Sequence, residues 1–167
     1  LNNKKRLKKD LDIFISKMTI RGTVLLADEG INGSLSGSKE DLDRIIKFIK
    51  KWANIRKLDI KINETDFLPF NRVKIRLKKE IVSLGIEKLN VAKSKRNYIE
   101  PKAWHKILSN KNIKLIDVRN IFEISIGKFN HAINPRTTSF RDFPISFKKL
   151  NLKKDDKIAI YCTGGIR

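Results

Sequence analysis

The residue with the most distinctive chemistry in this sequence is Cys162, the chain's single cysteine. It follows an apolar run, residues 157–161, of the kind that forms a buried parallel strand, and glycines and Arg167 come after it. Glycines let the backbone curl so that successive N–H groups point inward, and these donors with a nearby cation favour a thiolate over a thiol. The pattern predicts a reactive cysteine in a loop made of Cys162, Thr163, Gly164, Gly165, Ile166 and Arg167. A buried structural cysteine beside a glycine turn is the alternative interpretation.

The spacing within this loop narrows the chemistry. Four residues separate Cys162 from Arg167, one fewer than in phosphatases that use a cysteine nucleophile. A shorter loop makes a tighter cradle, which suits one extra atom on sulfur better than a tetrahedral phosphate. The loop therefore favours sulfur or oxygen chemistry over phosphate hydrolysis.

A second segment supports the same fold. Residues 113–119 form a strand-like run that ends in Asp117 and Arg119, and Glu123 follows. Together with the cysteine loop this resembles the rhodanese domain, whose signature is Asp-x-Arg, then Glu, then a Gly-His-Ile-x-Gly-Ala stretch. This chain departs from that stretch at Lys128 and His131, while Gly127, Ala132 and Pro135 match in order and spacing. The resemblance implies that Asp117 and Arg119 support the site structurally, as an ion pair with its hydrogen bonds.

A closer resemblance runs over nearly the whole chain. The segments that carry it are 21–27, 29–33, 73–85, 117–120, 140–144 and 162–167. In this order they resemble a bacterial family of rhodanese-related tRNA uridine hydroxylases. The resemblance implies an oxidoreductase that converts the wobble uridine in the anticodon loop of tRNA to 5-hydroxyuridine with molecular oxygen, and it implies that Cys162 is essential.

Several mechanistic alternatives stay open at this point. The Cys162 thiolate adds at C6 of uracil and makes C5 nucleophilic, or a persulfide or peroxy form of the cysteine activates oxygen. No flavin, haem or iron motif is identifiable, so we expect no cofactor and no metal site, with oxygen as co-substrate and an unassigned electron donor. The alternative function is a rhodanese-type sulfurtransferase that carries a persulfide on Cys162. A noncatalytic RNA-binding module is a third interpretation.

The net charge fits a nucleic-acid partner. Lys and Arg number 38 against 18 Asp and Glu, a net charge of +20, and such an excess favours polyanions. The abundance of lysine, isoleucine and asparagine also fits a compositionally biased genome. Arg136 and Arg141 lie in a basic, hydroxyl-rich segment, residues 135–141, which we expect to contact RNA or simply to begin a solvated helix.

The cysteine content and the apolar runs of the sequence indicate the cellular compartment. A single cysteine allows no internal disulfide, and no apolar run approaches the roughly 20 residues of a membrane span. The amino end has no apolar core typical of a signal peptide. We therefore expect a cytoplasmic protein with no membrane partner.

The chain divides into two predicted domains, residues 1–90 and 98–167, joined by a linker at 91–97. The first has helical spacing over 4–18, strands at 20–27 and near 30–37, a helix from Ser38 to Trp52, and alternating strands at Lys57–Ile62 and Arg72–Leu77. In the last of these, basic residues point outward. This order indicates a ferredoxin-like (acylphosphatase-like) α+β domain that lacks its first strand.

The second domain predicts an α/β rhodanese fold. A helix starts at Pro101, strands cover 113–118 and 157–161, helices cover 120–126 and about 139–149, and a short strand lies near His131–Asn134. Such alternation indicates a parallel sheet, whose carboxyl strand ends would bring Asp117 and Cys162 to one edge. Because the chain stops at Arg167, we expect this domain to be incomplete after the active-site loop.

Overall fold

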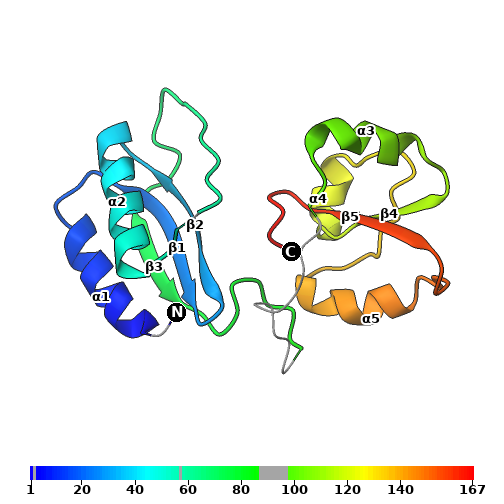
Figure 1. Ribbon diagram of the computed structural model, residues 1–167, viewed down its shortest axis with the longest axis horizontal. Coiled ribbons are helices and arrows are strands. Elements are labelled where there is room, and N and C mark those ends of the chain that lie inside the picture. The colour runs from blue at the N-terminus through cyan, green and yellow to red at the C-terminus, as the bar shows by residue number, and fades with distance from the viewer. Residues whose placement is uncertain (2, 57, 87–97) are drawn as a thin grey trace. The chain divides into compact units, whose positions relative to one another are not determined.

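The computed structural model describes residues 1, 3–56, 58–86 and 98–167. These residues form two compact units, Leu1–Ile81 and Val82–Arg167 (Figure 1). The predicted boundary at residue 90 and the linker at 91–97 lie outside the described residues, so both stay predictions. Each unit is described by itself below.

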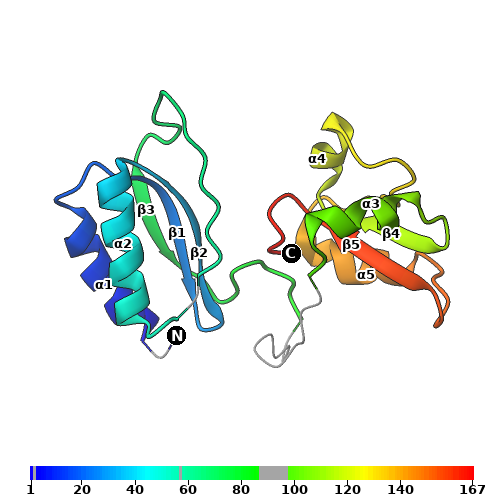
Figure 2. The same cartoon turned by 45° about the horizontal axis from the view of Figure 1, so that its top comes forward.

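The first unit has the predicted α+β arrangement. Its elements are α1 (Lys4–Ile15), β1 (Arg21–Ala27), β2 (Gly30–Ser36), α2 (Lys39–Trp52) and β3 (Val73–Leu77). The strands form a sheet in the order β2-β1-β3, with β1 antiparallel to β2 and parallel to β3. Both helices lie on one side of this sheet (Figures 1 and 2).

The sequence explains why the two helices form and which side they bury. The side chain of Asn3 accepts the N–H of Arg6 at the start of α1, and Ser38 accepts the N–H of Asp41 at the start of α2. Apolar residues at helical spacing then face the sheet. The buried core consists of Leu7, Leu11, Ile15, Ile20, Val24, Leu26, Ile45, Ile49 and Ile75. Each buried Leu, Ile or Val side chain stabilises the unit by about 1.5–3 kcal/mol.

One strand prediction is wrong. The segment Lys57–Ile62 alternates as a strand would, but the described part of it, residues 58–62, has no strand. Leu58 packs against the core, whereas the side chain of Ile62 is 80% exposed. The described part of the segment pairs with neither of the edge strands, β2 or β3, and an alternating segment without such pairing gains little over water.

The second unit contains the predicted parallel pair. Its elements are α3 (Pro101–Ser109), β4 (Ile113–Asp117), α4 (Ile121–Ile126), the 3-10 turn η2 (Phe140–Asp142), α5 (Phe143–Lys148) and β5 (Lys157–Tyr161). β4 pairs with β5 in parallel, with Asp117 beside Tyr161. In Figure 1, α3 and α5 lie on opposite sides of this pair. Cys162 follows β5 directly, as the sequence predicted.

Two further predictions are corrected in this unit. The strand near His131–Asn134 is reduced to one bridge, Ile133 with Ile116. The backbone of His131 has a φ of +62°, which breaks an extended run, and Pro135 removes a donor just beyond it. The helix expected over 139–149 is split into η2 and α5, with Pro144 in the first turn of α5.

Gly22 provides a test of the first unit. Its φ is +123°, and a Cβ added there would lie 2.1 Å from the backbone oxygen of Ser34. We expect Gly22→Ala to lower the free energy of unfolding by at least about 2 kcal/mol, because both the dihedral angle and the contact oppose a side chain. Chemical denaturation followed by circular dichroism measures this.

The matched control is Ser34→Ala, which removes an exposed hydroxyl from the same strand pair and leaves that backbone oxygen in place. It should change the free energy of unfolding by no more than about 0.5 kcal/mol. Equal stability of Gly22→Ala and the wild type would contradict the described hairpin register.

Candidate functional site

The loop after β5 curls around the sulfur of Cys162. The N–H of Gly165 donates to Cys162 Sγ at 3.0 Å, and Gly165 adopts a φ of +71°, in the left-handed region that glycine favours. The hydroxyl of Tyr98 donates to the carbonyl of Gly165 at 3.3 Å. Cys162 itself is half-exposed. The loop thus combines an accessible sulfur with a backbone donor aimed at it (Figure 2 shows this loop in red).

Glu123 holds both ends of this loop. Its Oε1 accepts the hydroxyl of Thr163 at 2.8 Å, and its Oε2 lies 2.7 Å from Nη2 of Arg167. Oε2 also accepts the N–H of Asn120 at 3.0 Å, which ties the carboxylate to the start of α4. One side chain therefore connects the residue after Cys162, the end of the loop and a neighbouring helix.

Arg167 has a different set of partners from the one the sequence suggested. We expected its cation beside the sulfur, but its guanidinium contacts Glu123 and donates from Nη1 to the carbonyl of Val118 at 3.5 Å. Its charge is therefore shared with a carboxylate. In this arrangement Arg167 fixes the loop, and the donor to the sulfur is the backbone of Gly165.

Asp117 is the centre of a second network at the same sheet edge. Its side chain is fully buried and accepts Nε and Nη2 of Arg119, the closest contact being 2.7 Å. The hydroxyl of Tyr161 donates to its Oδ2 at 2.6 Å. Arg119 Nη2 also donates to the carbonyl of Gly127 at 2.6 Å. The ends of β4 and β5 are thereby locked together beside Cys162.

The ionisation of these groups follows from their surroundings. Burial alone would raise the pKa of Asp117, but the hydrogen bonds from Arg119 and Tyr161 outweigh it and hold that pKa below its ordinary value. Burial likewise opposes the charge on Glu123, and the hydrogen bonds from Asn120, Thr163 and Arg167 keep its pKa low. Burial and the bond to Asp117 raise the pKa of Tyr161 to about 12. At neutral pH the carboxylates are charged and the phenol keeps its proton.

A pocket of about 440 Å³ opens beside Cys162. The rings of Phe129 and Tyr161 meet edge to face in it, with centroids 4.8 Å apart, and the rings of Trp104 and Phe129 also meet edge to face, with centroids 6.5 Å apart. The lining residues are Arg119, Gly127, Lys128, Phe129, Tyr161, Cys162 and Thr163. Aromatic faces and cationic groups around an accessible sulfur suit a planar base carried on an anionic backbone.

The other predicted site residues lie elsewhere. Gly164 and Ile166 are exposed in the loop, and Arg136 and Arg141 are exposed, with Arg141 in η2. Neither Arg136 nor Arg141 is among the residues that line the pocket beside Cys162. Their proposed contact with RNA stays a prediction.

The sequence did not reveal the aromatic wall of this pocket, which Phe129 and Tyr161 form. Tyr161 is the last residue of the strand-like run 157–161, and Phe129 lies between Lys128 and His131 in the partly kept signature, but neither pattern marks these residues as part of a site. The sequence held no direct signal for this contact, because Phe129 and Tyr161 are 32 positions apart and meet only in the folded chain. His131 explains the departure from the rhodanese signature: its positive φ is the conformation that a glycine at that position would adopt readily.

The part of the chain that the structure describes holds neither a metal-binding cluster nor a helix that could span a membrane. No group of three His, Cys, Asp or Glu side chains in the described part of the chain is placed to hold a metal ion. No helix among the described residues is long and apolar enough to cross a membrane.

Comparison with protein families matches both units. Residues 1–81 match the UPF0176 acylphosphatase-like domain, and residues 100–167 match the rhodanese-like domain. Both matches agree with the folds described above, a mixed sheet under two helices and a parallel pair that ends in the cysteine loop.

Individual relatives extend over most of the chain. A protein named tRNA uridine(34) hydroxylase from Wolbachia pipientis subsp. Culex pipiens (strain wPip) is 40% identical over 167 residues, which are 100% of this chain and 59% of the relative. Proteins of the same name from Rickettsia akari (strain Hartford) and Rickettsia bellii (strain OSU 85-389) are 45% and 41% identical, over 89% and 93% of this chain and 60% and 63% of theirs. The chain thus spans about 60% of the length of these relatives. The chain combines an acylphosphatase-like domain with a following rhodanese-like domain, and it is similar over most of its length to proteins named tRNA uridine(34) hydroxylase.

Proposed function

We propose that this chain is part of a cytoplasmic oxidoreductase that hydroxylates the wobble uridine of tRNA at C5, with molecular oxygen as co-substrate and Cys162 as the essential residue. The observation that carries the proposal is the accessible sulfur of Cys162 at the mouth of an aromatic and cationic pocket. The names of its relatives support the choice of tRNA as substrate.

The geometry supports specific roles. Phe129 and Tyr161 offer ring faces against which a splayed-out uracil packs, as single-stranded RNA bases commonly do on aromatic side chains. The sulfur of Cys162 then faces the base, and its thiolate adds at C6 and converts C5 into an enolate carbon. The N–H of Gly165 stabilises the thiolate before the addition.

The overall reaction fixes what else must take part. Replacing the C5 hydrogen by hydroxyl with one oxygen atom of O₂ sends the second oxygen atom to water. That balance requires a pair of electrons and a pair of protons from a reductant. Once C5 bears the new oxygen and has lost its proton, the sulfur leaves C6 and the ring recovers its double bond. Cys162 is therefore regenerated, and it is not itself the net electron source.

The first test is Cys162→Ser in the full-length protein, expressed in cells that lack the wild-type copy. A serine hydroxyl is close in size, but it keeps its proton at neutral pH and carries no persulfide. We expect 5-hydroxyuridine and its derivatives to disappear from the wobble position, as measured by mass spectrometry of tRNA nucleosides, while thiolated nucleosides persist.

The same experiment separates the alternatives. Loss of thiolated nucleosides, or of thiosulfate-to-cyanide activity, with hydroxylation intact would favour a sulfurtransferase that carries a persulfide on Cys162. If neither kind of nucleoside changed, Cys162 would be a structural residue and the proposal would be wrong.

A second test addresses the loop. Glu123→Gln keeps the shape of the side chain but removes the charge that pairs with Arg167, whose side chain is 19% exposed. We expect a loss of stability of about 2 kcal/mol and a fall in the single-turnover hydroxylation rate, because the loop is no longer held at both ends. Binding of tRNA should stay unchanged.

The matched control is Glu100→Gln, which makes the same chemical change at an exposed residue before α3. It should leave both stability and rate at the wild-type values. A Glu123→Gln protein that hydroxylates tRNA as fast as the wild type would show that the loop needs no such anchor.

A further inference from the structure

The strand β3 carries a regular stripe of basic residues that the site around Cys162 does not use. Its odd positions Val73 and Ile75 pack into the core of the first unit. The intervening positions, continued by one residue at each end of the strand, are all basic: Arg72, Lys74, Arg76 and Lys78. The alternation of the sequence predicts that these basic side chains point away from the core. They then lie on the side of the sheet opposite Val73 and Ile75.

Strand register shows which neighbours share that side of the sheet. Lys74 pairs with Thr23 and Arg76 with Leu25. Across the hairpin, Thr23 pairs with Ser34 and Leu25 with Asn32. Since paired residues point to the same side of a sheet, all six lie on one side. The helices α1 and α2 pack on the other side (Figures 1 and 2). We call this side of the sheet, with Thr23, Leu25, Asn32, Ser34, Lys74 and Arg76, the open face.

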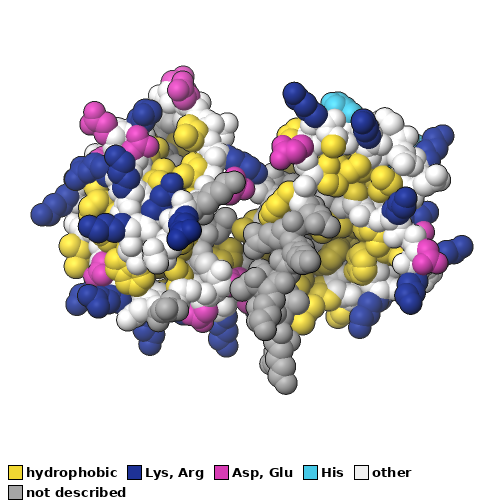
Figure 3. Space-filling view, in the orientation of Figure 1, with side chains coloured by type: hydrophobic (Ala, Val, Ile, Leu, Met, Phe, Trp, Pro, Cys, Tyr) yellow, Lys and Arg dark blue, Asp and Glu magenta, His cyan; other side chains and the backbone are white. Residues whose placement is uncertain are grey.

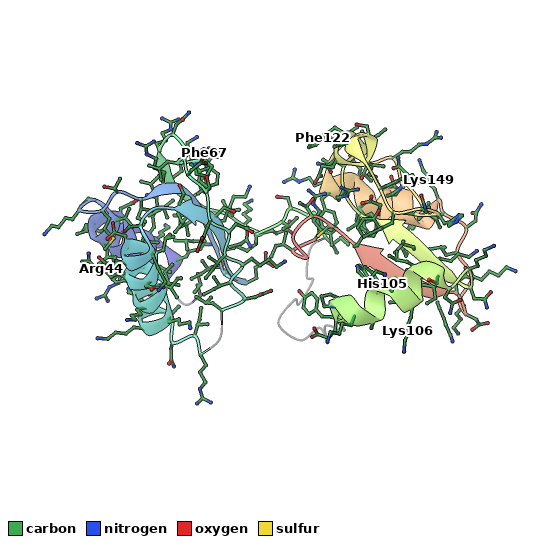
Figure 4. All side chains as sticks on the ribbon, turned by 90° about the horizontal axis from the view of Figure 1, so that it is seen from above. Arg44, Phe67, His105, Lys106, Phe122 and Lys149 are labelled. Carbon is green, nitrogen blue, oxygen red and sulfur yellow. The ribbon has the colours of Figure 1, made fainter. Side chains whose placement is uncertain are left out.

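The charges of the open face differ from those of the helices. Several cations on α1 and α2 pair with carboxylates of the same helix, as Lys8 does with Asp12 and Arg44 with Asp41 (Arg44 is labelled in Figure 4). Among the described residues, no carboxylate forms a salt bridge with Arg72, Lys74 or Arg76. In Figure 3, Lys and Arg also lie scattered over both units, so abundance alone marks no site. What distinguishes the β3 stripe is its regular spacing along one strand, on the side of the sheet that the helices leave uncovered.

A pocket lies on the open face beside this stripe. It has a volume of about 190 Å³ and is lined by Thr23, Leu25, Asn32, Gly33, Ser34 and Phe70. The carbonyl of Phe70 accepts Nη1 of Arg21 at 3.5 Å, which ties the segment that carries the ring to the start of β1. The pocket therefore offers one aromatic side chain with hydroxyl and amide groups, but no charge.

We propose that the open face is the surface on which this chain holds the tRNA backbone, with phosphates along Arg72, Lys74 and Arg76 and one unstacked base in the pocket at Phe70. This inference rests on the proposed function, because it takes tRNA as the substrate. Alternate residues of a strand are about 6.6 Å apart, which is close to the spacing of successive phosphates along an extended single strand. A flat basic strand beside an aromatic pocket combines the two elements by which proteins bind single-stranded nucleic acid.

The neutral pocket distinguishes RNA from a merely acidic partner. An acidic protein segment would be held by the cations alone, whereas a nucleic acid would also use the uncharged lining of Asn32, Ser34 and Phe70, where a base can stack and form hydrogen bonds. Sheet-face stacking of this kind favours loop nucleotides over paired ones, since paired bases have no free face. We therefore expect a tRNA anticodon stem-loop to bind better than a duplex of equal length.

The test replaces the stripe in the full-length protein with Arg72→Gln, Lys74→Gln and Arg76→Gln together. Affinity for an unmodified tRNA transcript is measured by fluorescence anisotropy between about 50 and 200 mM salt. Each lost phosphate contact should lower the slope of log affinity against log salt by about 0.7 to 0.9, a total of about 2 to 3. Affinity should fall by about 10- to 100-fold at the lower salt concentration.

The matched control removes the same charge from the helix layer, with Lys5→Gln, Lys9→Gln and Lys47→Gln, all exposed positions on α1 or α2. It should leave both the affinity and the salt slope close to wild type. A separate variant, Phe70→Ala, should weaken binding of the stem-loop by about 5- to 100-fold without changing the slope, because stacking releases no counterions. Circular dichroism confirms that each variant is folded.

The outcomes separate this surface from the proposed function. Wild-type affinity and slope in the β3 variant, or an equal loss in the helix control, would overturn the open face as the tRNA surface. In either case, a loss of hydroxylation in the Cys162→Ser protein would still support the proposed function. A wild-type protein that binds duplex and stem-loop equally, with one salt slope, would likewise overturn the base pocket at Phe70.

Discussion

A carboxylate with no access to water, that of Asp117, is the constraint on which the candidate active site depends. A buried charge left unpaired costs several kcal/mol, so the chain around it must supply donors. Arg119 and Tyr161 supply them, and they come from the ends of the two parallel strands. Because Tyr161 directly precedes Cys162, satisfying the buried charge also fixes where the cysteine loop begins.

The same residues that neutralise Asp117 also shape the pocket. Arg119 reaches on to the carbonyl of Gly127, and the hydroxyl of Tyr161 accepts the N–H of Phe129 at 3.2 Å. Both contacts hold the 127–132 segment against the strand ends, and this brings the ring of Phe129 beside that of Tyr161. Glu123 then fixes the far end of the loop through Arg167. One connected set of polar contacts therefore holds both the strand ends and the site. The conformation of the loop depends on these contacts as well as on the sequence of the loop.

Much of this arrangement was predictable because it follows from local patterns. The strands at 113–117 and 157–161, the helices that start at Ser38 and Pro101, and the position of Cys162 after a strand all come from periodicity and capping. The partners of Arg167 and the aromatic wall were not predictable, since they depend on contacts between residues some 30 to 50 positions apart. The missing strand at 58–62 shows the same limit. Alternation indicates a preference for extended structure, but a strand forms only where the segment pairs with a neighbouring strand.

The central claim is that the sulfur of Cys162 faces the RNA base in the pocket of Phe129 and Tyr161. The most direct measurement is the rate at which iodoacetamide alkylates Cys162, followed by peptide mass spectrometry, with and without an anticodon stem-loop that carries uridine at the wobble position. The account predicts that alkylation slows in proportion to the fraction of protein bound and approaches zero at saturation, while a duplex at equal occupancy protects far less. An alkylation rate that stays unchanged when the stem-loop is fully bound would place the RNA away from Cys162 and contradict the account.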